Sequence, residues 1–107
     1  MIPFIVQVFQ APEVDPNNSG WFVKMMFGSS RVYHAENIHR WAKAKLIAQN
    51  SIVVPENYSN AAFRKLVFES VGISPNGMKK KKLGIMYPDN VIAVWQLDNI
   101  RVVVIRR

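Results

Sequence analysis

The C-terminal segment VIAVWQLDNIRVVVIRR, residues 91–107, restricts the fold of this chain more than any other part of the sequence. It predicts two strands, at 91–97 and 100–106, joined by a two-residue turn at Asp98 and Asn99. Both faces of this hairpin are apolar, so each face has to be covered. We expect helices on one face and loops, another sheet or the second subunit of a homodimer on the other. The turn implies the cross-strand pairs Leu97 with Ile100, Trp95 with Val102, Ala93 with Val104, Val94 with Val103 and Ile92 with Ile105.

The segments before this hairpin predict two strands followed by two helices. Residues 2–10 and 21–27 are apolar enough for strands, and the intervening segment contains the Pro, Asn and Gly residues of a loop. From Glu36 to about Gln49 apolar residues recur every three or four positions, which predicts the first helix. The second helix should begin after Ser59, whose hydroxyl can accept from a backbone amide, and end at Gly72.

A further strand at 83–87 would pair with the C-terminal hairpin through a turn at residues 88–90, with Asn90 in the left-handed region. The predicted fold class is therefore α+β, with an N-terminal two-stranded unit, two helices and a C-terminal three-stranded antiparallel meander. We expect a single globular domain over residues 1–107, because 107 residues of which 50% are hydrophobic can form their own core.

Cysteine is absent from the chain, which excludes disulfides, thiolate metal sites and a cysteine nucleophile and fits a reducing compartment. The N-terminus lacks the basic start and cleavage site of a secretory signal. No apolar stretch approaches the roughly 18 residues that a membrane helix needs. We therefore expect a cytoplasmic protein without membrane contact.

Positive charge is the strongest indication of function, because 14 Lys and Arg residues outnumber 7 Asp and Glu residues and give a net charge of +7. The excess is concentrated in residues 31–50 and 71–107, a distribution typical of a surface that meets a polyanion. The leading hypothesis is a nonenzymatic protein that binds the backbone of DNA or RNA mainly through phosphate contacts. The candidate contact residues are Arg31, Tyr33, His39, Arg40, Lys43, Lys79, Lys80, Lys81, Lys82, Arg101, Arg106 and Arg107.

Each group of candidates also has a structural interpretation. The lysines at 79–82 follow the turn sequence Ser-Pro-Asn-Gly, so they are either phosphate contacts or a solvated loop. Basic residues on the first predicted helix fit a phosphate-binding face or an ordinary exposed face. The C-terminal arginines fit bidentate phosphate contacts or protection of a sheet edge. Tyr33 is the best candidate for base stacking, whereas Trp41 and Trp95 are expected to pack in the core.

Two alternatives compete with this hypothesis. A protein-interaction module, an inhibitor or regulator, would use the same charge to dock on an acidic partner protein. A metal-free ribonuclease would use His34, His39 or Arg101 in acid–base work and charge stabilisation. The C-terminal hairpin resembles the closing strands of small bacterial toxin ribonucleases, but two predicted strands precede the first helix here and no diagnostic residue is present. We assign no catalytic residue, and the spacing of His34, Glu36 and His39 predicts neither a metal site nor a cofactor.

Overall fold

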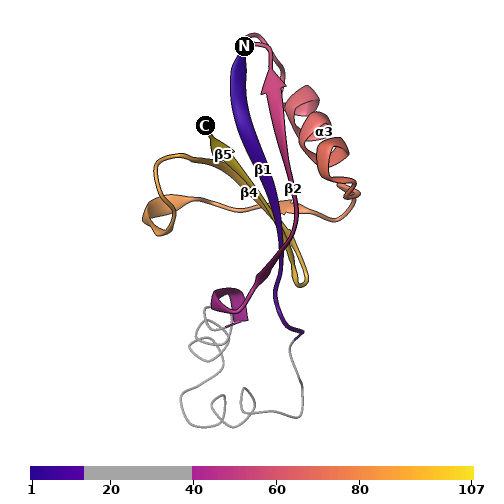
Figure 1. Ribbon diagram of the computed structural model, residues 1–107, viewed down its shortest axis with the longest axis vertical. Coiled ribbons are helices and arrows are strands. Elements are labelled where there is room, and N and C mark those ends of the chain that lie inside the picture. The colour runs from indigo at the N-terminus through magenta and orange to yellow at the C-terminus, as the bar shows by residue number, and fades with distance from the viewer. Residues whose placement is uncertain (14–39) are drawn as a thin grey trace, which may run out of the picture. The chain divides into compact units, whose positions relative to one another are not determined.

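The computed structural model describes residues 1–13 and 40–107. These residues form an α+β structure in which five strands make one antiparallel sheet and one main helix packs against it (Figure 1). The chain divides into two compact units, residues 1–9 together with 46–107, and residues 10–45. The sheet order is β2-β1-β5-β4-β3. The elements are β1 (Ile2–Gln10), β2 (Lys45–Val54), α3 (Asn60–Val71), β3 (Lys79–Lys80), the 3-10 turn η1 (Gly84–Met86), β4 (Val91–Leu97) and β5 (Ile100–Arg106).

The predicted C-terminal hairpin is confirmed, with β4 and β5 at the expected residues. Asp98 has a positive φ of 52°, which suits the first position of a tight two-residue turn. Four of the five predicted cross-strand pairs are present. The fifth is wrong, because the register shifts between Val91 and Ala93. Val91 therefore lies opposite Ile105, and Ile92 is the extra residue of a bulge.

Helix α3 begins and ends where its capping residues predict. The Ser59 hydroxyl accepts a hydrogen bond from the Ala62 amide at 3.1 Å. At the other end Gly72 adopts the left-handed conformation, with φ 69°. The Ile73 amide then donates to the Phe68 carbonyl at 3.2 Å, which closes the helix. Both ends of α3 are thus fixed by side-chain chemistry that can be recognised in the sequence.

Replacing Ser59 with alanine is expected to lower the free energy of unfolding by about 1 kcal/mol, because the Ala62 amide would lose its acceptor. Urea denaturation of the two proteins measures this difference. Ser59→Asp keeps an acceptor at the same position and should retain most of the stability. Equal losses in the two variants would contradict the capping role.

The main core lies between α3 and one face of the sheet. Trp95 of β4 is at its centre, with ring centroids 5.3 Å from Phe68 and 6.3 Å from Phe63. Val94 and Val103, which point to the opposite face, are buried as well, so both faces of the β4–β5 hairpin are covered as its pattern predicts. The buried cluster against α3 consists of Phe4, Val6, Val8, Ile52, Val54, Phe63, Val67, Phe68, Met78, Ala93, Trp95, Val102 and Val104.

The prediction of a first helix reaching Gln49 is wrong at its C-terminal end. Residues 40–42 are helical, but β2 begins at Lys45. The alternation from Ala48 onward explains the difference, because Ile52 and Val54 are buried whereas Val53 between them is exposed. Burial on alternate residues belongs to a strand and overrides the helical spacing of the preceding residues.

The prediction of a strand at 83–87 is also wrong. Residues 84–86 form η1, and the third strand of the C-terminal meander is β3, a few residues earlier. Gly84 has a positive φ of 52°, whereas Asn90 does not adopt the predicted left-handed conformation. Strand β1 pairs with β2 and β5 inside the five-stranded sheet, so it does not form a separate two-stranded unit. The predicted strand at 21–27 and residues 36–39 of the predicted helix lie outside the described residues.

The single-domain organisation of the whole chain stays a prediction. Within residues 1–13 and 40–107, no helix has both the length and the apolar character needed to span a membrane.

Candidate nucleic-acid interface

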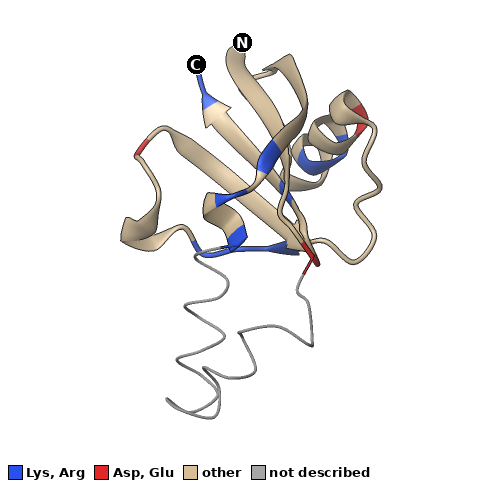
Figure 2. Ribbon diagram, turned by 60° about the horizontal axis from the view of Figure 1, so that its bottom comes forward, with Lys and Arg blue, Asp and Glu red and all other residues tan. Residues whose placement is uncertain are grey.

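The lysine run at 79–82 is anchored along one edge of the sheet. Lys79 lies opposite Gln96 and Lys80 opposite Trp95 in the antiparallel pairing of β3 with β4. The Lys81 amide extends this pairing, because it donates to the Val94 carbonyl at 2.8 Å. The run is therefore partly a strand, and its backbone has a defined course along the sheet edge, marked by the continuous blue segment in Figure 2.

A turn and a buried side chain fix the start of the run. The Met78 amide donates to the Pro75 carbonyl at 3.1 Å, which closes the turn of the Ser-Pro-Asn-Gly sequence. The Met78 side chain is buried in the main core. Burial of Met78 and the pairing of β3 with β4 together hold four consecutive cationic residues at the surface.

All four lysine side chains are exposed. None of them forms an ion pair with another described residue, unlike Lys65 of α3, which pairs with Glu69. The ammonium nitrogen of Lys80 lies 5.9 Å from the centroid of the Trp95 ring, an additional weak contact. Because no described carboxylate pairs with them, these ammonium groups can face an external anion.

A polar row crosses the sheet beside the lysine run. Gln96 of β4 lies opposite Lys79 on one side and opposite Arg101 of β5 on the other. The Arg101 Nε and Nη2 atoms both donate to Gln96 Oε1, at 3.1 and 2.8 Å. Strand alternation places this row on the face opposite α3, because the neighbouring Trp95 and Val102 face the helix. The guanidinium of Arg101 is thus oriented by Gln96 two strands inward from the sheet edge.

The terminal arginines lie elsewhere on the sheet. Arg106 and Arg107 are exposed at the end of β5, where the Arg106 amide donates to the Asn90 carbonyl at 2.8 Å. Arg106 is five positions after Arg101, which corresponds to about 17 Å along β5. Lys79 therefore lies level with Arg101 through Gln96, whereas Arg106 and Arg107 lie at the far end of β5 from Arg101.

The remaining candidates belong to the other compact unit or lie outside the described residues. Arg40 is the first of the described helical residues 40–42, and Lys43 follows them in a turn. Both belong to the unit formed by residues 10–45, and the Arg40 guanidinium is 5.6 Å from the centroid of the Trp41 ring. Arg31, Tyr33 and His39 lie outside the described residues, as does His34 of the ribonuclease alternative. The packing role expected for Trp95 is confirmed by its burial, so it does not offer a stacking platform.

Three residues of this region were missed in the sequence. Gln96 belongs to no sequence motif, and only the strand register shows that it lies between Lys79 and Arg101. Ile85 and Met86 in η1 are strongly exposed, although the predicted strand at 83–87 implied that such residues pack against a neighbouring strand. No sequence pattern distinguishes exposed apolar residues of a short turn from those of a strand.

One groove formed wholly by described residues has a structural explanation. It lies between α3 and the loop after it, and has a volume of about 580 Å³. Arg64 crosses it, donating from Nη2 to the Pro75 carbonyl at 2.8 Å and lying over the Phe68 ring. Arg64 thus holds the loop after α3 against the helix, and the groove lies around this contact.

Among the described residues, no group of three His, Asp or Glu side chains is placed to hold a metal ion. Comparison with protein-family models, with curated proteins and with solved structures finds no match to this chain.

Proposed function

We propose that this chain is a nonenzymatic nucleic-acid-binding protein whose affinity comes mainly from phosphate contacts. The observation that carries the proposal is the anchored lysine run, in which four exposed ammonium groups follow one another along a sheet edge and pair with no carboxylate among residues 1–13 and 40–107. Lysine acts as a flexible point charge, which suits contacts to phosphates at varying distances better than the reading of bases.

The backbone of the lysine run supports this function. A free loop would lose conformational entropy when its side chains meet a ligand, whereas the backbone of β3 is already held by β4. Arg101 adds a positive charge in the same row as Lys79, on a guanidinium that Gln96 holds in place. The proposed contact set on the sheet is therefore Lys79, Lys80, Lys81 and Lys82, with Arg101 in the same cross-strand row as Lys79.

A protein-interaction module that docks on an acidic partner is the second candidate. The exposed Ile85 and Met86 favour it, because they follow the lysine run directly and lie in the connection from β3 to β4. Apolar side chains next to cationic ones suit the core and rim of a protein interface. This candidate predicts that free DNA and RNA bind weakly or not at all.

Titration of the purified chain with labelled single- and double-stranded DNA and RNA, at several salt concentrations, separates the two candidates. We expect binding that weakens with salt at a log–log slope of about −3 to −6, because each contact to a duplex phosphate contributes about −0.9. The labelled RNA should remain intact throughout. Absence of binding at low salt would reject the proposal and favour an acidic protein partner. RNA cleavage in the presence of a chelator would favour the metal-free ribonuclease.

A further inference from the structure

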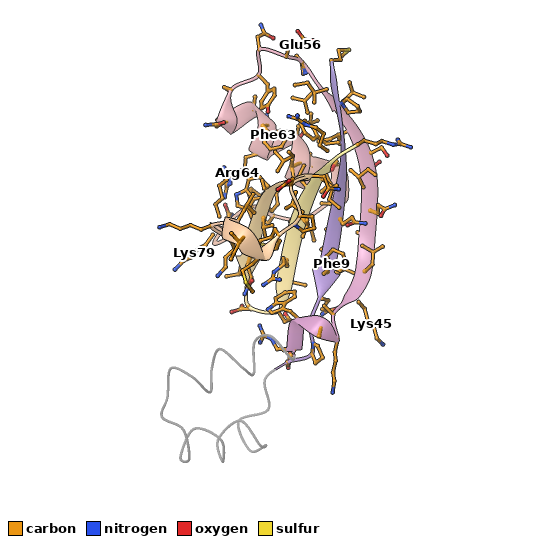
Figure 3. The ribbon with its side chains drawn as sticks, turned by 90° about the vertical axis from the view of Figure 1, so that its left-hand side faces the viewer. Phe9, Lys45, Glu56, Phe63, Arg64 and Lys79 are labelled. Atoms are coloured by element: carbon orange, nitrogen blue, oxygen red, sulfur yellow. The ribbon has the colours of Figure 1, made fainter. Side chains whose placement is uncertain are left out.

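The two edges of the sheet differ in length and chemistry. Strand β3 at one edge has two residues, both lysines, and is thus short and charged. Strand β2 at the other edge has ten residues, of which only Lys45 is charged. Figure 3 shows β2 bordering the sheet on the side away from Lys79. A sheet edge that is short and rich in lysine resists pairing with other chains. Strand β3 has both properties, whereas β2 is long and has one lysine.

Strand β2 is exposed although it is rich in apolar residues. Leu46, Ile47 and Val53 retain 49%, 48% and 52% of their accessible surface. Its neighbour on one side is β1, and no backbone hydrogen bond joins its other side to another described residue. The first proline beyond its start is Pro55, after the strand has ended. This side of β2, which pairs with no described residue, is therefore a long row of backbone donors and acceptors flanked by apolar side chains, and it can act as a template for another strand.

We infer that the unpaired edge of β2 binds β2 of a second copy of this chain, antiparallel and centred on Asn50, so that two sheets join into one. The sequence of β2 is complementary to itself in this register. Ile47 of each copy lies opposite Val53 of the other, and Gln49 lies opposite Ser51. In this register a two-fold axis passes between the Asn50 residues of the two copies. The pair of Ile47 with Val53 occurs once on each side of the axis, and so does the polar pair of Gln49 with Ser51.

The distribution of charge also permits this pairing. Lys45 is the sole charge of β2 and lies at its first residue, opposite Pro55 in the proposed register. The two Lys45 residues are then separated by about ten residues of strand, or about 33 Å, so they do not repel strongly. The lysine runs of β3 lie at the two outer edges of the joined sheet. A second copy therefore covers the apolar edge without bringing the cationic surfaces of the two copies together.

The register also determines where the helices lie. Residues opposite each other in an antiparallel pair point to the same face of the sheet. Ile47 and Val53 have the same parity along β2, opposite to that of Ile52 and Val54, which are buried against α3. Both α3 helices therefore lie on one face of the joined sheet, and the two polar rows containing Gln96 lie on the other.

The first test compares two double variants by sedimentation equilibrium. The wild-type chain should show twice its mass of 12.3 kDa, with a dimer fraction that rises with concentration. Ile47→Lys combined with Val53→Lys should reduce the mass to that of a monomer, because four ammonium groups would meet at the interface. Ile85→Lys combined with Met86→Lys makes the same change of charge at exposed residues away from β2 and should leave the dimer intact. A monomeric wild type, or a dimer in the Ile47→Lys and Val53→Lys variant, would overturn the inference.

A second test does not depend on destabilising substitutions. The chain has no cysteine, so Ser51→Cys introduces a single thiol. In the proposed register the two Ser51 residues are diagonal neighbours, about 7 to 8 Å apart. A short bis-maleimide should link them into a covalent dimer, whereas Ser74→Cys in the loop after α3 should give little product. Equal yields from the two variants would overturn the pairing. Neither test contains nucleic acid, so the result is independent of the proposed function.

Discussion

Replacing Phe68 with alanine is expected to lower the free energy of unfolding by about 3 to 5 kcal/mol. Phe68 is 1% exposed and contacts the Trp95 ring edge-on, with centroids 5.3 Å apart. The substitution removes apolar surface from the core and leaves a cavity between α3 and β4, and both effects destabilise the fold. It also removes an aromatic pair that contributes about 0.5 to 1.5 kcal/mol beyond area burial. Small domains are typically stable by about 5 to 15 kcal/mol, so this loss is a large fraction of the total.

Urea denaturation monitored by circular dichroism measures the loss, and Ile85→Ala is the matched control. Ile85 is also a large apolar residue, but it is fully exposed in η1, so its truncation should change the unfolding free energy by no more than about 0.5 kcal/mol. Similar losses in Phe68→Ala and Ile85→Ala would contradict the packing of α3 on β4. Unfolding of the Phe68→Ala chain at low urea would agree with the packing, because the expected loss approaches the stability of a small domain.

The parts of the fold that were predicted correctly are those with local signals. The ends of α3 follow from Ser59 and Gly72, whose capping chemistry acts within a few residues. The β4–β5 hairpin follows from its two-residue turn and from alternation on both sides of it. These signals depend on neighbours in the sequence, so tertiary contacts were not needed to interpret them.

The errors concern strands whose pairing depends on distant residues. Strand β3 consists of two lysines, which have little strand preference, and it forms because β4 offers hydrogen-bonding partners at Gln96 and Trp95. Strand β2 begins only three residues after a helical segment, and the apolar spacing of the helix continues into it by coincidence. The same limit applies to the candidate interface. Exposure of the lysines could be predicted from their composition, but their link through Gln96 to Arg101 required the register of three strands.

Replacing all four lysines at 79–82 with glutamine is expected to reduce the affinity for nucleic acid by about 60-fold to 4,000-fold near 0.1 M salt. Each contact to a duplex phosphate adds about −0.9 to the salt slope, which corresponds to about eightfold in affinity between 1 M and 0.1 M salt. The range covers the loss of two to four contacts. The slope should therefore become less steep by about 2 to 4, and fluorescence anisotropy at several salt concentrations measures both quantities.

The matched control replaces the same four lysines with arginine, which keeps every charge on the same backbone and should retain the affinity and the salt slope. A second control, Lys65→Gln, removes a charge from the exposed surface of α3, where Lys65 pairs with Glu69 at 4.0 Å, and should change affinity little. An unchanged salt slope in the glutamine variant would show that the lysine run does not contact phosphates. If affinity fell without a change in slope, the run would act through the shape of β3 and its contact with Trp95, and the phosphate role would be wrong. The slope decides between these outcomes because only released counterions change it.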